Sequence, residues 1–574
     1  MIYALISIGK ACADEYPNPL VEIPYTSWKK GKEPKVLVVD LLTDSSGSLI
    51  PKGVVLADYS LEDAKKKYLF RDPKRAQGPA ASLSFKLPGK PRALRQRLGI
   101  LKILGYSADI EDIASFIEKE MEGFKTSGML AKGVQVLVVL KIDGKWPFEN
   151  ERFENSFESE FFKRLGLYEK KPVWEVDSIC HGCGKETKVY GGVGNLLKFY
   201  TVDKHGYAPE LNPELSWKQY ALCRDCILNL ERGRRAVDDF LTYSFYGKDF
   251  WLLPVAAFGL EEVLEGFRCF RGKVYKEEFV NLEDELLYEA SLKQNVILYH
   301  FVFTAKEQQA LRILLHIEEV LPSLLSKYVE TKRNTEEKFN LFLSEFLDER
   351  YRFSFFTSHL KATSKKPGFT DKDFFEIVDA VFRKAPLDEK LILSKVMDRV
   401  RADIAEQGDK FLLPRRGILE AFISLLFLKR WGVVNTSGGI DMHQRSGNFA
   451  EFFETFEDFF DHPAKKALVL LGVLIQKFLN YQFTQRGSTP FAKHLKNLRL
   501  SQKDVQNLFV SLQNKMMEYE VAHKWQDLKA AIASELVEAG SKWKLSPDEI
   551  GFYIVVGMAL HKHPVFGREI GQEG

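Results

Sequence analysis

The first 175 residues combine apolar runs with one amphipathic segment. Two runs rich in Val, Leu and Ile, each bounded by polar residues, predict buried strands at residues 35–42 and 133–142. Between them, apolar residues recur at helical spacing over Ile110–Phe124, and Ser107 or Asp109 is suited to cap that helix. We therefore expect a mixed α/β domain at the N-terminus.

The pattern changes along the second half of the chain. Aromatic residues are dense over Phe250–Phe303, and segments such as residues 295–304 predict strands. Because aliphatic residues accompany the aromatics on both faces, a buried core is favoured over a base-stacking platform. From Ala305 onward the apolar spacing predicts helices, at residues 306–328, 372–382, 390–405 and 417–430; an earlier helix is expected at residues 217–246.

A break at Trp431–Gly439 marks the start of a last, helical domain. Its candidate helices are residues 449–460, 464–483, 490–498, 501–519, 524–538 and 546–561. The segments Ser501-Gln-Lys-Asp and Ser546-Pro-Asp-Glu are typical helix starts, the second with Pro at the first helical position. We expect a compact helical bundle.

Four of the six cysteines form two Cys-x-x-Cys pairs separated by residues 184–222. Such pairs let two thiolates reach one ion from a tight turn, and two pairs complete the closed tetrahedral shell of structural Zn²⁺. The predicted ligands are Cys180, Cys183, Cys223 and Cys226. His181 and His205 are expected to be exposed loop residues, with substitution for a thiolate as the alternative. Two disulfides are the alternative, which a chain of this length and low cysteine content disfavours. Cys12 and Cys269 lie in apolar sequence and are expected to be buried.

These patterns predict an α+β multidomain protein. Its parts are a mixed α/β domain (residues 1–175), a zinc-ribbon module (176–232), an aromatic-rich sheet followed by helices (233–435), and an α-helical bundle (436–574). The N-terminus lacks the basic flank and cleavage site of a signal peptide, and the longest apolar run, Ile550–Leu560, is too short for a membrane helix. We expect a cytoplasmic protein without a membrane partner.

The net charge of +3 hides one strongly basic stretch. Between Lys65 and Lys102 a single acid, Asp72, accompanies the basic residues Lys65, Lys66, Lys67, Arg71, Lys74, Arg75, Lys86, Lys90, Arg92, Arg95, Arg97 and Lys102. A run of one sign favours a polyanion such as nucleic acid over a merely solvated face. A second candidate patch near the C-terminus comprises Arg486, Lys493, Lys496, Arg499 and Lys503, which Lys465 and Lys466 could join.

Motifs of the common enzymes are missing from the sequence. It has no ATP-cradling loop, His-Glu-x-x-His or Gly-x-Ser-x-Gly. Gly191-Gly192-Val193-Gly194 is expected to be a hairpin turn. The segment Ser437-Gly-Gly-Ile-Asp441 is similar to the metal-holding turn of palm-type polymerases and cyclases, but it offers one carboxylate where two are needed. We expect no catalysis, with a palm-type nucleotide polymerase or cyclase as the alternative.

The C-terminal sequence resembles a known family. The segments Leu470–Gln482, Arg486-Gly-Ser-Thr-Pro-Phe491, Lys493–Leu498 and Leu545–Ile550 resemble the large subunit of type I-B CRISPR-Cas effector (Cascade) complexes. The double Cys-x-x-Cys, and Lys67-Tyr-Leu-Phe-Arg71 before a basic loop, are similar to that family too. Between about residues 270 and 460 no specific resemblance is found.

The resemblance implies a non-catalytic subunit at the crRNA 5′ end of a surveillance complex. There it would aid recognition of the protospacer-adjacent motif in double-stranded target DNA, stabilise the R-loop and recruit the helicase-nuclease. Its other implied partners are the backbone, small-subunit and crRNA-processing endonuclease subunits. A zinc-ribbon scaffold that binds only protein is a further alternative.

In that family the C-terminal part can also be made separately, as a small helical subunit. Codons for Gly438-Gly439 can spell a ribosome-binding sequence, with Met442 as the start of a separate product. The alternative is an ordinary Gly-Gly linker.

Overall fold

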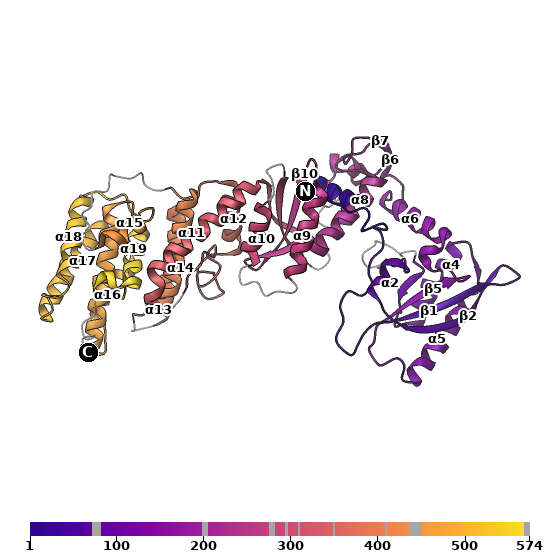
Figure 1. The fold of residues 1–574 in the computed structure, drawn as a ribbon, viewed down its shortest axis with the longest axis horizontal. Helices are drawn as coiled ribbons and strands as arrows, with labels where there is room; N and C mark the ends of the chain where they lie inside the picture. The colour runs from indigo at the N-terminus through magenta and orange to yellow at the C-terminus, as the bar shows by residue number, and fades with distance from the viewer. Residues whose placement is uncertain are drawn as a thin grey trace. The chain divides into compact units, whose positions relative to one another are not determined.

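The computed structural model describes residues 1–71, 82–197, 205–274, 282–292, 297–307, 310–347, 350–407, 411–435 and 449–567 (Figure 1). These residues form two compact units. Unit 1 comprises residues 1–242, 251–268 and 304–313. Unit 2 comprises residues 243–250, 269–303 and 314–574.

Unit 1 is built on a mixed five-stranded sheet of order β3-β5-β1-β2-β4. β1 pairs in parallel with β5 and antiparallel with β2, so β1 lies at the centre. The strands are β1 (Lys35–Thr43), β2 (Ser48–Asp58), β3 (Ser84–Lys86), β4 (Ser107–Ala108) and β5 (Val136–Ile142). Both strands predicted from sequence, now β1 and β5, are confirmed and fully enclosed, with burial along nearly their whole length.

Five helices accompany this sheet in sequence. They are α2 (Leu61–Lys66), α3 (Pro91–Leu98), α4 (Ile100–Ile103), α5 (Ile110–Thr126) and α6 (Glu151–Leu165). α5 is the helix predicted from apolar spacing, and its N-cap is Asp109, whose side chain accepts from the backbone N–H groups of Glu111 and Asp112. Figure 1 shows α5 along one side of the β1–β2 pair.

A three-stranded sheet of order β6-β7-β8 follows α6 in unit 1. It contains β6 (Glu175–Ile179), β7 (Glu186–Tyr190) and β8 (Leu222–Cys223), with the short helix α7 (Gly194–Leu197) between the last two. β8 leads directly into α8 (Arg224–Ala236), which packs against the N-terminal helix α1 (Ile2–Ala11).

The Gly191–Gly194 segment is a turn between β7 and α7, so the expected hairpin turn is wrong. A Cβ on Gly191 would lie 2.6 Å from the Cβ of Trp217, and one on Gly192 would lie 2.5 Å from the carbonyl oxygen of Leu165. These glycines therefore permit close packing of the chain against itself.

A four-stranded sheet of order β12-β11-β10-β9 follows α8 in the chain and precedes the C-terminal helices. Its strands are β9 (Thr242–Phe245), β10 (Lys248–Ala256), β11 (Ile297–Glu307) and β12 (Ala310–Val320), and the helices α9 (Leu260–Val274) and α10 (Leu282–Ser291) lie between β10 and β11 in sequence. The aromatic residues predicted to form a core do so: Phe250 lies 5.6 Å from Phe301 and 5.3 Å from Phe303, ring centre to ring centre, and all three are buried.

Two helix predictions in this region are wrong. Residues 306–307 end β11, residues 310–320 form β12, and the helix α11 begins only at Pro322 and ends at Leu347. Residues 217–246 contain 3₁₀ turns, β8, α8, a π-helical turn over Val237–Leu241 and β9 in place of one continuous helix. In both stretches apolar residues recur at three- and four-residue spacing, a pattern that here does not separate a strand or short turns from a helix.

The remainder of unit 2 is helical, as predicted. Its helices are α12 (Asp371–Arg383), α13 (Glu389–Glu406), α14 (Arg415–Trp431), α15 (Ala450–Thr455), α16 (Pro463–Arg486), α17 (Gln502–Glu518), α18 (Gln526–Ala539) and α19 (Pro547–Leu560), with a 3₁₀ segment over Pro490–Leu498. Among the described helices, α16 alone is long and apolar enough to cross a membrane, but 72% of its apolar window is buried in the protein, as in a core helix.

Helices on both sides of residue 436 share one core. α19 contacts α16 but also α13 and α14, and all of these belong to unit 2. The segment 436–448, which includes Met442 and the Gly438-Gly439-Ile440-Asp441 motif, lies outside the described residues.

Candidate metal centre

The first Cys-x-x-Cys pair occupies the turn between β6 and β7. The backbone N–H of Gly184 donates to the carbonyl of Cys180 at 2.8 Å, and that of Cys180 donates to the carbonyl of Lys185 at 2.9 Å. Gly184 has a φ of +72°, a left-handed conformation that glycine adopts without strain. Gly182 is needed for another reason, because a Cβ there would lie 2.9 Å from the Sγ of Cys226.

The second pair spans the end of β8 and the first turn of α8. Cys223 is the N-cap residue of α8 and Cys226 lies in its first turn, so the helix directs both thiols to the same side. The backbone N–H of Cys223 donates to the Sγ of Cys180 at 3.2 Å, which joins the two pairs. His181 forms backbone and side-chain hydrogen bonds with Ala221, at 3.0 and 3.1 Å.

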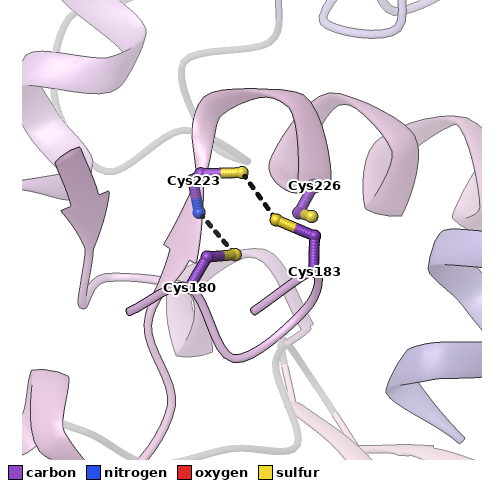
Figure 2. A group of neighbouring side chains, drawn as sticks. All are labelled: Cys180, Cys183, Cys223 and Cys226. Carbon is purple, nitrogen blue, oxygen red and sulfur yellow. Dashed lines mark hydrogen bonds between the residues drawn. The ribbon is translucent and has the colours of Figure 1, made fainter. Parts of the chain in front are cut away.

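The four thiols converge on one point, as Figure 2 shows. Their sulfur atoms all lie within 4.8 Å of one another, and those of Cys183 and Cys223 are 3.8 Å apart. A tetrahedral Zn²⁺ with zinc–sulfur bonds of about 2.3 Å separates its sulfurs by roughly 3.8 Å. All six cysteines are described and none is disulfide-bonded, so the geometry fits a metal ligand set rather than the disulfide alternative.

The pKa values of the cysteine thiols favour the binding of a cation. Burial opposes charge on Cys180, but hydrogen bonds from the backbone of Cys223, Cys183 and Gly182 outweigh it and lower the pKa of this thiol to about 7. Burial raises the pKa of Cys223 to about 11 and raises the pKa of Cys226 further. Cys180 therefore ionises more readily than Cys223 and Cys226, and a divalent cation would supply the positive charge that favours ionisation of the latter two.

The cluster is closed and lies against helices of unit 1. Cys180, Cys223 and Cys226 are buried, and four protein sulfurs would leave no position for water or substrate. The hydroxyl of Tyr3 on α1 donates to the carbonyl of His181 at 2.7 Å, and Arg224 on α8 forms a 2.7 Å ion pair with Glu158 on α6. Such an ion would brace α1, α6 and α8 rather than catalyse a reaction.

The basic residues predicted to bind nucleic acid divide into several groups. Lys65, Lys90, Arg92 and Lys102 are exposed and form no ion pair with the part of the chain that the structure describes. Lys86 is exposed, with its ammonium 5.0 Å from the ring centre of Tyr25, and Arg97 is half-buried. Lys65, Lys90, Arg92 and Lys102 are therefore available to contact a phosphate backbone.

Three other members of the basic stretch already have acidic partners. Lys66 pairs with Glu62 at 2.6 Å, Lys67 pairs with Asp63 at 2.7 Å, and Arg95 pairs with Glu118 at 2.8 Å as well as with Glu111. The local excess of positive charge is therefore smaller in the fold than in the sequence, because helices α2 and α5 supply carboxylates.

Arg71 is an interior residue. It is only 8% exposed, donates to the carbonyl of Leu20 at 3.0 Å, and places its guanidinium 4.4 Å from the ring centre of Phe161 on α6. Burial lowers its pKa, and the nearby carboxylate of Glu231 acts in the opposite direction. A phosphate contact by Arg71 would require this packing to open.

Lys74 and Arg75 lie outside the described residues, and so does the side chain of Lys496. In the C-terminal patch Arg486, Lys493, Arg499 and Lys465 can be compared directly. The first three are exposed, and the guanidinium of Arg486 lies 4.8 Å from the ring centre of Tyr519. Lys465 and Lys466 are buried, and Lys465 pairs with buried Asp461 at 2.6 Å, so these two lysines do not join an exposed patch.

Of the two cysteines outside the cluster, Cys269 is exposed, contrary to expectation, whereas Cys12 is buried as expected.

Two clusters of titratable side chains were not predicted. Glu231, Arg234 and Arg235 on α8 form a charged cluster beside Arg71, in which Glu231 is 2% exposed and pairs with Arg234 at 2.8 Å. His300, His316 and Glu318 gather on β11 and β12. Alternation along each strand places His316 and Glu318 on the same face, a signal that was present in the sequence.

Comparisons with known proteins match two parts of the chain to one protein family. A model described as the central domain of CRISPR-associated protein TM1802 matches residues 177–320, which include all four cysteines of the cluster. A model of the C-terminal domain of the same protein matches residues 351–569. The two matches together cover more than half of the chain. A search of curated proteins finds no match.

Proposed function

Since the chain belongs to the TM1802 family of CRISPR-associated proteins, we propose that it is the non-catalytic large subunit of a type I-B CRISPR RNA-guided surveillance complex. In this role it binds the crRNA 5′ end and double-stranded target DNA, aids recognition of the protospacer-adjacent motif, stabilises the R-loop and recruits the helicase-nuclease. Its neighbours are the backbone, small-subunit and crRNA-processing endonuclease subunits. It acts in the cytoplasm.

The observation that carries the proposal is the closed four-cysteine cluster within the matched central domain. A closed cluster supports a structural ion, and a subunit that delegates sequence reading to base pairing needs a rigid scaffold with cationic surfaces, not a catalytic centre. The exposed cations Lys65, Lys90, Arg92 and Lys102 provide such a surface in unit 1. Exposed Arg486, Lys493 and Arg499 provide a second one in unit 2.

The palm-type enzyme has less support. Its candidate turn lies outside the described residues, but the flanking elements are the helices α14 and α15, where a palm fold requires strands. Incubation of the purified protein with nucleoside triphosphates and Mg²⁺ tests this point directly. Turnover that persists through purification would overturn the non-catalytic assignment.

The DNA-binding role is tested by charge reversal in the reconstituted complex. The double variant Lys90→Glu/Arg92→Glu should weaken target binding, because each phosphate contact releases a counterion on binding. If both residues contact phosphates, the slope of log K against log salt should fall by about 2. The measurement is a salt titration of target-DNA affinity.

Lys119→Glu/Lys132→Glu is the matched control, because it changes the net charge equally at exposed lysines outside the predicted set. Equal weakening by both variants would mean that charge acts at long range without a site. Unaltered binding by the Lys90/Arg92 variant would remove these residues from the interface, and a complex that assembles but leaves no footprint on DNA would favour the protein-only scaffold.

A further inference from the structure

The four-stranded sheet of β9–β12 carries a polar cluster on one face, and an aromatic core lies on the opposite face. Along β11 the side chains of Tyr299, Phe301 and Phe303 are 0–1% exposed, and His300 lies on the other face of the strand. His316 and Glu318 are two residues apart on β12, the neighbouring strand, and so share one face. We call His300, His316 and Glu318 the histidine cluster.

Three donor atoms meet in the histidine cluster. The Nδ1 of His300 lies 3.1 Å from the Nε2 of His316 and 3.8 Å from the Oε1 of Glu318. One ligand atom from each of the three residues lies within 4.8 Å of the other two. The side chains of both histidines are mostly buried, at 13% and 23% exposed, whereas that of Glu318 is 52% exposed.

These distances match the spacing of ligands around a metal ion. A tetrahedral ion with bonds of about 2.0–2.1 Å to nitrogen or oxygen separates its donors by roughly 3.3 Å. The His300–His316 separation of 3.1 Å is already close to that value, and Glu318 needs only a small rotation of an exposed side chain to reach it. Two imidazoles and one carboxylate are also a donor set typical of Zn²⁺ and its first-row neighbours.

We propose that His300, His316 and Glu318 form a second metal site, which binds a divalent first-row transition ion such as Zn²⁺ and keeps one coordination position open. The site differs in kind from the four-cysteine cluster. Three protein ligands leave the fourth position to water or to an oxygen donor of a bound molecule, whereas four thiolates close the shell. The proposal does not depend on the proposed role in DNA binding.

The sheet holds the ligands in place before any ion arrives. β11 and β12 are neighbours in the sheet, and only two residues separate them in sequence, so they pair antiparallel because a parallel pair needs a long crossover. The guanidinium of Arg383 on α12 donates to the carbonyl of His316 at 2.8 Å, which fixes the backbone of this ligand. Ligands on paired strands lose little freedom on binding.

A metal-free arrangement makes a different prediction. One neutral imidazole could donate to the other across the 3.1 Å gap, with a second, longer contact of 3.5 Å from His316 Nδ1 to Glu318. That chain would use both ring nitrogens of His316 for hydrogen bonds and would show no selective uptake of metal. The two arrangements are therefore separable by metal content alone.

The experiment measures metal per chain and the spectrum of the Co²⁺-substituted full-length protein. The wild type should take up a second equivalent beyond the thiolate site after dialysis against Zn²⁺ or Co²⁺. His316→Gln should lose that second equivalent and keep the thiolate-to-cobalt charge-transfer band of the cysteine cluster. Addition of azide should shift the weak visible bands of the wild type, since the open position accepts it.

Two control variants complete the design. Glu319→Gln changes the neighbouring exposed carboxylate and should retain the second equivalent. Cys226→Ser should lose the charge-transfer band and keep the azide-sensitive bands. His300→Gln repeats the test from the other strand if His316→Gln proves unstable.

The proposal is overturned if the histidine variants bind as much metal as wild type, or if wild type binds only the thiolate-held ion. An azide-insensitive second ion would overturn the open position. None of these results bears on target-DNA affinity, which tests the proposed function separately.

Discussion

Four glycines allow two helix pairs to approach unusually closely, one pair in each unit. A Cβ on Gly9 of α1 would lie 1.7 Å from the carbonyl oxygen of Asn229 on α8, and one on Gly233 of α8 would lie 1.9 Å from that of Leu5. In unit 2, Gly472 of α16 and Gly557 of α19 lie equally close to backbone carbonyls of the opposite helix. In each pair both helices contribute a glycine to the crossing.

Replacement of Gly9 by alanine should therefore destabilise unit 1 strongly. The clash is with backbone, which no rotamer change relieves, so the cost should reach or exceed the upper end of the roughly 1–3 kcal/mol typical of overpacking. Gly123→Ala is the matched control in helix α5, where a Cβ meets nothing within 4 Å, and it should stabilise by about 0.5–1 kcal/mol. Chemical denaturation of both variants measures the difference, and equal stability would refute the close crossing.

A second prediction at the scale of single residues concerns the four-cysteine cluster. Cys226→Ser should lose bound zinc and lower the melting temperature of unit 1, because metal-binding energy contributes to folding. Each kcal/mol lost lowers Tm by roughly 2–4 °C in a unit of this size. Cys269→Ser, an exposed cysteine outside the cluster, should change neither zinc content nor Tm.

Zinc affinity should also fall with decreasing pH. Because burial raises the pKa of Cys223 to about 11, binding an ion must displace its proton, and that displacement becomes harder as pH falls. Zinc release measured with a chromogenic chelator should therefore increase steadily from neutral to acidic pH. Release that is independent of pH would mean that the thiols are not the ligands.

Spacing in the sequence was enough to predict the four-cysteine cluster, but not whether individual cationic side chains are exposed or buried. The Cys-x-x-Cys geometry is local, so sequence distance translates directly into spatial distance. Arg71 and Lys465, in contrast, became interior residues because of contacts with Phe161 and Asp461, which lie in other elements. A side chain with a long apolar stem suits either the surface or a paired interior position, and sequence alone does not distinguish them.

At the scale of elements, local signals identified helices better than strands. The boundaries of α12, α13 and α14 agree with prediction to within two residues, because amphipathic spacing and caps are properties of the segment itself. β11 was predicted as a strand over residues 295–304, whereas β12, an edge strand, was taken for helix because its apolar residues also recur at three- and four-residue spacing. β2 was missed because Pro51 and the surrounding glycine and lysine weaken its strand pattern.

The caps of the last helices can be tested individually. The Ser546 hydroxyl accepts from the backbone N–H of Glu549 at 3.2 Å, and the Glu549 carboxylate accepts from the backbone N–H of Ser546 at 2.6 Å. Ser546→Ala should cost about 1 kcal/mol of stability because it leaves an N–H of α19 without its partner. Ser511→Ala, within α17, is the control and should change stability by less. Equal losses would show that the cap is not the cause.

At the scale of the whole molecule, the C-terminal bundle depends on the helices before it. Phe342 on α11 stacks on His563 with ring centres 5.0 Å apart, and the His563 ring nitrogen lies 2.9 Å from the carbonyl of Phe342. Arg401 on α13 is 7% exposed, pairs with Asp548 on α19 and donates to the carbonyl of Leu498 at 3.2 Å. The sequence break at residues 431–439 therefore does not divide the core of unit 2.

A product that starts at Met442 would consequently expose surface that the full chain covers. α19 is buried from Glu549 to Leu560, in part by α13 and α14, and such a fragment lacks both. Residues 442–574 expressed alone should self-associate and bind a hydrophobic dye, whereas the full-length chain should bind less dye because α13 and α14 cover α19. Light scattering and dye fluorescence measure this difference. A monomeric short fragment that unfolds cooperatively and binds no dye would show that the bundle is autonomous; if it self-associates as expected, a separate small subunit must find its missing cover on a partner within the complex.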